Sequence, residues 1–280
     1  MSMSAVNGEQ PVEDLETDLL LEGVFRRFGH DFRGYRRPVL QHKLQAAMQQ
    51  LGVKTVSGLQ ERVMHETRAA ESLLRELSAH PAGLLEDAGY LRILREAVVP
   101  LLRSCPSPRI WIAECLHAED ACVLSAMLDE EQLLDRTQIF ATVENESLLH
   151  EASGGRLAFE HLARYAENYR ESGGKIDLRE YCSKENGYAV FSDRLRANIT
   201  WEQYSLATNA SFNEFQLIIC RHALGEFGTV LRNRALRLFY DSMPLYGILS
   251  LDPDASLEAT PFISRYKAIA PEQGLYRRIA

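Results

Sequence analysis

Apolar residues recur at helical spacing through the first part of the chain. Over residues 15–78 they repeat every three or four positions, as at Leu19, Val24 and Phe28, a pattern that predicts amphipathic helices. A second helix is expected to begin near Pro38, because proline is tolerated in a first helical turn, and two more helices follow. Residues 15–80 are therefore predicted to form a small all-helical domain.

From residue 109 the pattern changes to short apolar runs that alternate with amphipathic helices. Predicted strands cover Arg109–Ala113, Gln138–Val143, Ile199–Leu206, Phe215–Cys220 and Tyr246–Leu251. Predicted helices cover residues 119–134, 147–151 and 228–243. Such alternation favours an α/β domain, with a mostly parallel sheet covered by helices on both faces.

The remaining segments complete the predicted domain organisation. Residues 1–14 are polar and are expected to be a disordered leader. Residues 81–108 are expected to be a linker helix, and the α/β domain spans 109–257. Within that domain, residues 160–198 fit the alternation poorly and are interpreted as an insertion. Residues 258–280 are expected to be a C-terminal tail.

Composition narrows the classes of protein that fit. The net charge is −8, which argues against a nucleic-acid binder, whose phosphate contacts need a basic surface. No apolar run reaches the 18 residues of a membrane-spanning helix, and the N-terminus lacks the pattern of a signal peptide. We therefore expect a cytoplasmic chain without membrane insertion. Its five cysteines form no CxxC motif, so we expect reduced thiols and no metal site.

The loop after the first predicted strand carries the most specific signal. Residues 110–120 read IWIAECLHAED, which resembles the strand-to-helix signature W-x-A-G-C-S-T-G-E-E of CheR-type chemotaxis receptor methyltransferases. Residues 35–40, 137–142 and 213–227 resemble further segments of that family in the same order. The resemblance implies an S-adenosylmethionine-dependent, Rossmann-like methyltransferase domain behind a small helical domain. Family members methylate glutamates of membrane chemoreceptors.

Several positions depart from the family pattern where the cofactor is expected. The two glycines after the first strand are replaced by Glu114 and Ala118, although a Cβ there takes space that the cofactor needs. Glu114 also brings a carboxylate near the carboxylate of the cofactor. The acidic residue that ends the second strand is replaced by Val143, and Glu144 follows it, where strand alternation would direct it to the other face.

More departures follow at positions that the resemblance assigns to the pocket. Ser205 stands in place of an asparagine near the adenine. Arg221 is kept, whereas His222 and Glu226 replace an asparagine and a tyrosine. In the linker, Glu86 replaces an arginine that reaches the site, which reverses a charge where a substrate glutamate would bind. No catalytic residue is therefore expected, and Glu86 and Glu226 mark the altered catalytic positions.

Two clusters of charge have both a functional and a structural interpretation. Glu114, Glu119, Asp120 and Glu144 could bind a cation, but a solvated helix start, where carboxylates favour the positive end of the dipole, explains Glu119 and Asp120 better. The helical domain also carries a basic cluster, which either docks an acidic partner helix, as the resemblance implies, or is an ordinary charged helix face. Its members are Arg26, Arg27, Arg33, Arg36, Arg37, His42 and Lys43.

These observations lead to three hypotheses. The first is a pseudo-methyltransferase that has lost S-adenosylmethionine and works as a binding or regulatory module in chemosensory or two-component signalling. Its partner would be a signalling protein or the cytoplasmic region of a chemoreceptor. The second is an active protein-glutamate O-methyltransferase with a remodelled pocket, which uses S-adenosylmethionine. The third is a sensor of another small ligand in the altered pocket.

Overall fold

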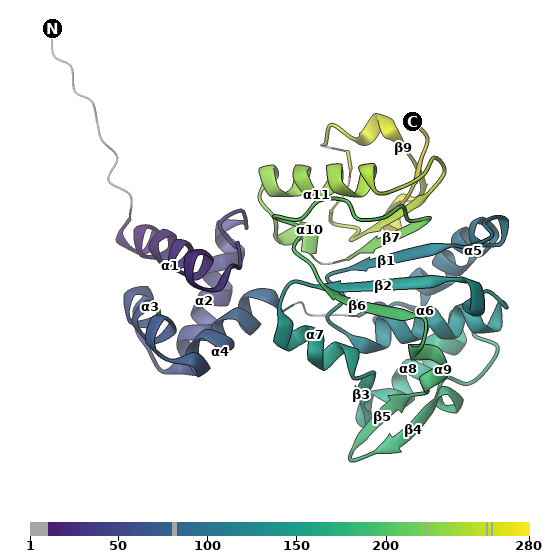
Figure 1. Cartoon of the computed structure of the whole chain (residues 1–280), viewed down its shortest axis with the longest axis horizontal. Helices are drawn as coiled ribbons and strands as arrows, with labels where there is room; N and C mark the ends of the chain where they lie inside the picture. The colour runs from purple at the N-terminus through teal and green to yellow at the C-terminus, as the bar shows by residue number, and fades with distance from the viewer. Residues whose placement is uncertain (1–10, 80–82, 222, 256, 259) are drawn as a thin grey trace, which may run out of the picture. The chain divides into compact units, whose positions relative to one another are not determined.

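The computed structural model describes residues 11–79, 83–221, 223–255, 257–258 and 260–280. The chain divides into two compact units, with the boundary between Ser78 and Ala79. Figure 1 shows a helical first unit and a second unit built on a sheet. The predicted fold class, a small all-helical domain followed by a Rossmann-like α/β domain, is confirmed.

The first unit consists of α1 (Val12–Phe28), α2 (Arg37–Leu51), α3 (Val56–His65) and α4 (Thr67–Ser78). Leu20, Leu59 and Leu73 are fully buried in its apolar core. The helix α1 begins at Val12, so the end of the predicted leader is helical, while residues 1–10 lie outside the described part of the chain. The four predicted helices are otherwise present.

A buried lysine ties two of these helices together. Lys43 on α2 is 7% exposed, and its Nζ donates a hydrogen bond of 2.9 Å to the backbone oxygen of Leu77 on α4. Carbonyl groups near the end of a helix have no partner within the helix, so this bond supplies one. Lys43 was predicted to lie on a basic docking face. That prediction is wrong, because the ammonium group is directed into the unit.

The second unit contains a seven-stranded sheet in the order β6-β2-β1-β7-β8-β10-β9. Its parallel strands are β1 (Arg109–Ala113), β2 (Gln138–Val143), β6 (Ile199–Gln203), β7 (Leu217–Cys220) and β8 (Ile248–Leu251). The antiparallel strands are β9 (Tyr266–Ala270) and β10 (Leu275–Arg278). Residues 258–280 were expected to be a C-terminal tail, but they contain the strands β9 and β10 of this sheet. They are short, and the middle of β9 is exposed, so they leave almost no apolar pattern.

Helices cover both faces of this sheet. They are α5 (Ala88–Ser104), α6 (Ala118–Glu130), α7 (Glu146–Ser153), α8 (Phe159–Glu171), α9 (Asp193–Arg196), α10 (Ala223–Glu226) and α11 (Thr229–Asp241). Ile110 and Ile112 join the core formed with α5 and α6. Trp111 between them packs against Phe239 of α11, because neighbouring strand residues point to opposite faces.

The expected linker helix belongs to the core of the second unit. Tyr90, Leu94 and Leu102 of α5 are fully buried there. A short 3₁₀ helix, η1 (Leu84–Glu86), leads into α5, and Asp87 caps α5 by accepting a hydrogen bond of 2.9 Å from the backbone nitrogen of Tyr90. Residues 83–104 therefore form a wall of the α/β unit.

The predicted insertion over 160–198 has regular structure of its own. The strands β4 (Cys182–Glu185) and β5 (Tyr188–Phe191) form a second, antiparallel sheet with β3 (Arg156–Ala158). The helix α8, which follows β3, packs against α5. Further 3₁₀ turns are η2 (Leu134–Arg136), η3 (Leu178–Tyr181), η4 (Ile263–Arg265) and η5 (Pro271–Gln273).

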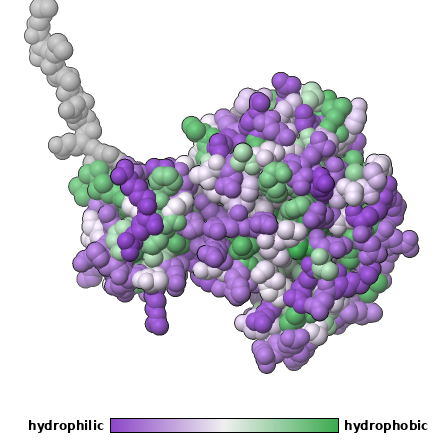
Figure 2. Space-filling view, in the orientation of Figure 1, coloured by the Kyte–Doolittle hydropathy of each residue, from purple (hydrophilic) through white to green (hydrophobic). Residues whose placement is uncertain are grey.

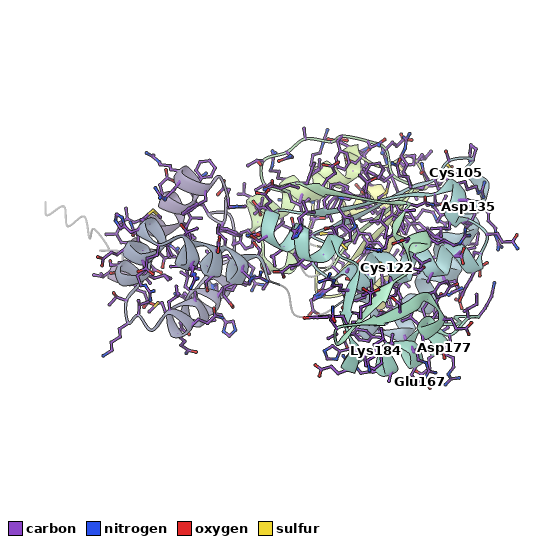
Figure 3. The ribbon with its side chains drawn as sticks, turned by 60° about the horizontal axis from the view of Figure 1, so that its bottom comes forward. Cys105, Cys122, Asp135, Glu167, Asp177 and Lys184 are labelled. Atoms are coloured by element: carbon purple, nitrogen blue, oxygen red, sulfur yellow. The ribbon has the colours of Figure 1, made fainter. Side chains whose placement is uncertain are left out.

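The face shown in Figure 2 is mainly polar, and the five cysteines are free thiols. Figure 2 shows a mainly hydrophilic face, with hydrophobic residues in small scattered groups. All five cysteines are free, and Figure 3 shows Cys105 and Cys122 well separated. Among the described helices, none has both the length and the apolar character that crossing a bilayer requires.

The lysine bond between α2 and α4 gives a test of the first unit. Replacing Lys43 with alanine should destabilise the unit by about 1–3 kcal/mol, because the Leu77 carbonyl group loses a buried donor. Replacing the exposed Lys54 with alanine should change the free energy of unfolding by less than about 0.5 kcal/mol. Urea unfolding of both variants measures the difference, and equal effects would show that the buried bond adds no stability.

Candidate functional site

The order of the strands identifies the crevice where ligands bind in sheets of this class. The chain runs from β1 outward to β2 on one side, then returns to β7 on the other side of β1. In open α/β sheets, ligands bind outside the carboxyl ends of the strands at such a reversal of strand order. The residues that follow β1 and β7, beginning with Glu114 and Arg221, therefore form the candidate site.

The turn after β1 has a backbone conformation that favours glycine. Glu114 has a φ of +55°, in the left-handed region, which costs a residue with a Cβ about 1–2 kcal/mol. The turn is held by a hydrogen bond of 2.9 Å from the backbone nitrogen of Cys115 to the backbone oxygen of Thr142. The backbone has therefore kept the conformation of the expected glycine, while the side chain is a glutamate.

The space at this reversal of strand order is small. The cavity has a volume of about 20 Å³, enough for roughly one water molecule. Sites for drug-sized ligands measure about 300–1,000 Å³. Its lining includes Leu84, Ile112, Glu114, Asp120, Ile219 and Arg221.

Asp120, in the first turn of α6, lies buried beside this cavity. Its Oδ1 accepts a hydrogen bond of 2.6 Å from the backbone nitrogen of Leu84, and only 7% of the residue is exposed. Burial, and next the nearby charge of Glu119, raise the pKa of the Asp120 carboxyl well above its usual range. The interpretation of Glu119 and Asp120 as a solvated helix start is therefore wrong, because both residues are buried.

A wider cavity of about 580 Å³ lies beside the first turn of α6. Its lining includes His117, Ala118, Glu119, Arg156, His161 and Tyr188, and no residue of β7. His117 Nδ1 lies 4.0 Å from Glu119 Oε1. Burial raises the pKa of the Glu119 carboxyl. No group of acidic, histidine or cysteine side chains within the described residues is arranged to hold a metal ion.

A buried carboxylate, that of Glu144, follows the end of β2. The alternation of side chains along a strand had predicted that Glu144 points to the other face of the sheet. Val143 is fully buried, and Glu144 after it is 7% exposed. Glu144 Oε1 accepts a hydrogen bond of 3.0 Å from the hydroxyl of Ser205, which follows β6. The pairing of β2 with β6 therefore brings Glu144 and Ser205 together at the same edge of the sheet.

Arg221, after β7, turns toward α5. Its guanidinium lies 3.9 Å from the ring centre of the buried Tyr90, and the Tyr90 hydroxyl lies 2.8 Å from Ser250 Oγ on β8. These contacts hold Arg221 on the wall of the site. His222, the next predicted position, lies outside the described residues.

The two altered catalytic positions lie on different elements. Glu86 turns to α8, where its Oε1 accepts hydrogen bonds of 2.8 Å from Arg164 and 2.7 Å from the Tyr165 hydroxyl. Glu226 is half-buried at the end of α10. The carboxylate of Glu86 is therefore paired with Arg164 on α8.

Most of the predicted basic cluster is paired within the first unit. Arg26 bonds to Glu22, and Arg33 bonds to both Glu22 and Asp31. The further ion pairs join Arg37 to Asp14 and Asp18. Arg27 lies over the ring of Phe28, and Arg36 at the start of α2 also has a partner. Exposed ion pairs of this kind contribute little stability, and they reduce the positive field that a docking face would offer.

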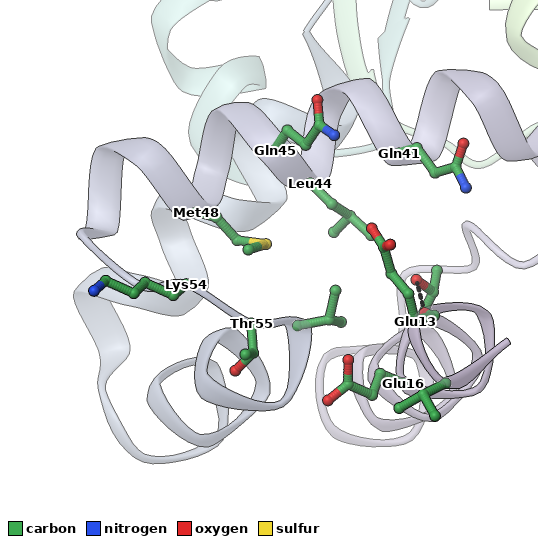
Figure 4. A pocket seen from close by; sticks show the side chains of 11 residues that line it. Glu13, Glu16, Gln41, Leu44, Gln45, Met48, Lys54 and Thr55 are labelled. Atoms are coloured by element: carbon green, nitrogen blue, oxygen red, sulfur yellow. Dashed lines mark hydrogen bonds between the residues drawn. The ribbon is translucent and has the colours of Figure 1, made fainter.

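The first unit also has a groove of about 450 Å³ between α1, α2 and the turn before α3. Figure 4 shows Leu44 and Met48 of α2 facing Glu13 and Glu16 of α1 across it. The sequence analysis had not identified this groove, although its lining residues Gln41, Leu44, Gln45 and Met48 share one face of α2.

Comparisons with known proteins agree with the fold. The family description "CheR methyltransferase, all-alpha domain" matches residues 15–78, and "CheR methyltransferase, SAM binding domain" matches residues 83–260. The chain is 36% identical to "Putative methyltransferase Cher3" of Pseudomonas putida, over 95% of this chain and 97% of that protein. It is 22% identical to "Chemotaxis protein methyltransferase 1" of Pseudomonas aeruginosa, over 86% and 89%.

Among solved structures, the N-methyltransferase NodS from Bradyrhizobium japonicum, in complex with S-adenosyl-L-homocysteine, aligns with 79% of this chain and 97% of its own. The TM-score is 0.37 and the identity 9%.

The buried carboxyls predict how stability changes with pH. Because the folded-state pKa values of Asp120 and Glu119 are raised, the folded state holds more protons than the unfolded state above about pH 4. Stability contributed by protonation should therefore fall as the pH rises through the folded-state values. Each unit by which a pKa is raised corresponds to roughly 1.4 kcal/mol. Replacing Asp120 with asparagine should flatten this fall.

Urea unfolding of wild type and D120N at several pH values between 4 and 8 measures the effect. The asparagine carbonyl oxygen can still accept the bond from Leu84, so the two proteins should differ mainly in their pH dependence. Parallel curves over the whole range would contradict the raised pKa of Asp120.

Proposed function

This chain belongs to the CheR methyltransferase family, and we propose that it works as a non-catalytic module of that family in chemosensory signalling. In this proposal its site is closed to S-adenosylmethionine. The partner is a signalling protein or the cytoplasmic region of a chemoreceptor, which the protein binds without modifying it.

The observation that carries the proposal is the occupied crevice at the ends of β1 and β7. A cofactor seated there needs several hundred Å³, whereas the cavity measures about 20 Å³. The backbone nitrogen of Leu84 donates to the carboxyl group of Asp120, and both residues line this cavity. We take this arrangement as support for a site that does not admit the cofactor.

Charge supports the same proposal. Glu114 follows β1 where the backbone is left-handed, and the amino-acid end of the cofactor carries a carboxylate of its own. Two like charges close together in a site of low polarity repel each other. Glu86, which replaces an expected arginine, is paired with Arg164 on α8 and supplies no positive charge to a substrate carboxylate.

A second candidate function is S-adenosylmethionine-dependent methylation of protein glutamates. The family and the names of the relatives support this candidate better than the first, since none of those names indicates a loss of cofactor binding. One feature of the site also favours it: Glu144 places a buried carboxylate at the carboxyl end of β2, where it could accept hydrogen bonds from ribose hydroxyls. In that case the cofactor supplies the methyl group, and the chain binds and orients it.

Calorimetry with S-adenosylhomocysteine distinguishes the two candidates. The non-catalytic proposal predicts no saturable heat for the full chain up to about 1 mM ligand, a limit that corresponds to a binding free energy weaker than about −4 kcal/mol. The matched positive control is the Pseudomonas aeruginosa relative under the same conditions. Micromolar binding by this chain, together with transfer of a radiolabelled methyl group to a receptor cytoplasmic fragment, would overturn the proposal in favour of the second candidate.

A further inference from the structure

The segment that precedes α5 is fixed from two sides over the candidate site. On one side, the Leu84 backbone nitrogen donates to the buried Asp120. On the other side, Asn168 on α8 donates a hydrogen bond of 2.7 Å to the backbone oxygen of Leu85. Leu84 is 4% exposed and Leu85 is fully buried, so the segment packs as part of the core.

The segment lies so close to Asp120 before Leu84 that a side chain there would force one of the two to shift. A Cβ added to Gly83 would lie 2.7 Å from Asp120 Oδ1, well inside normal contact. Gly83 has a φ of −98°, a value that other residues also adopt, so the glycine is favoured by the nearby carboxyl group rather than by backbone conformation. Gly83 and Asp120 are therefore matched to each other.

The side chains around the segment add to its attachment. Glu86 bonds to Arg164 and Tyr165 on α8, and Asp87 caps α5. Four consecutive residues from Leu84 onward thus each have a hydrogen bond from the backbone or the side chain to α5, α6 or α8. An unsatisfied backbone N–H in such a buried place costs free energy comparable to a lost hydrogen bond, so the Leu84–Asp120 bond fixes where the segment lies.

We infer that Asp120 is a specificity-determining residue that holds residues 83–86 in the ligand crevice, so that the protein's own backbone occupies the space of a cofactor. This inference rests on the proposed non-catalytic function and supplies its physical cause. A carboxylate at the first turn of α6 would be available to an ammonium group of a ligand in an open site. Here it is satisfied by Leu84, and a ligand would have to break that bond and displace two buried leucines.

Hydrogen exchange of the full chain tests this contact directly. The Leu84 amide should be protected in the wild type. In D120A it should exchange at least about tenfold faster, a ratio that corresponds to about 1.4 kcal/mol. The amide of Ile112 on β1, which reports opening of the sheet, should keep its wild-type rate. D120N is the matched control, because its side-chain oxygen still accepts, and its Leu84 amide should stay within about threefold of the wild type.

The variant Gly83→Ala breaks the same contact from the other side without removing a polar group. Its added methyl group should displace the segment and accelerate exchange at Leu84 as D120A does. If D120A does not fold, the exchange rate of the Leu84 amide in G83A tests the inference by itself. An unprotected Leu84 amide in the wild type, or unchanged exchange in a folded D120A or G83A, would overturn the inference.

The hydrogen-exchange test of the Asp120–Leu84 contact and the binding test of the proposed function can fail independently. If the wild type binds no S-adenosylhomocysteine while Leu84 exchanges at the same rate in every variant, Asp120 does not close the site and the inference fails alone. If the wild type binds S-adenosylhomocysteine with micromolar affinity, the non-catalytic function fails, whatever the exchange rates.

Discussion

A buried carboxyl group determines the shape of the candidate site. Asp120 lies in the first turn of α6, directly after the loop that leaves β1, and water reaches only 7% of the residue. A buried polar group needs a partner, and here the partner is the backbone nitrogen of Leu84. Through this bond the short helix η1, which precedes α5, is joined to the first turn of α6. The order of the strands indicates where ligands bind, and we propose that this bond limits the room there.

The electrostatics of the site follow from the same closure. Three acidic side chains, Glu114, Glu119 and Asp120, gather around the loop after β1, and burial raises the pKa of the last two. Arg221 is the positive group that lines the small cavity, and it lies over the ring of Tyr90. The raised pKa values favour the protonated, neutral form of Glu119 and Asp120.

Much of the fold could be predicted from the sequence, because helical spacing and buried strands leave clear apolar patterns. The strand over Arg109–Ala113 was predicted with its observed bounds, whereas β9 and β10 were missed because their residues are mostly exposed or too few. Glu144 was expected to point away from the site, since alternation was extended past the end of β2. The chain leaves the strand there, so the alternation no longer holds. The contact of Asp120 with Leu84 had no sequence signal, because a backbone N–H is the same in every residue except proline.

We propose that the chain's own backbone fills the cofactor crevice. A crystal structure of the full chain, grown with excess S-adenosylhomocysteine, tests it most directly. The account predicts Leu84 bonded to Asp120, with no nucleoside density at the ends of β1 and β7. Density for S-adenosylhomocysteine at those strand ends, with residues 83–86 displaced from Asp120, would contradict it.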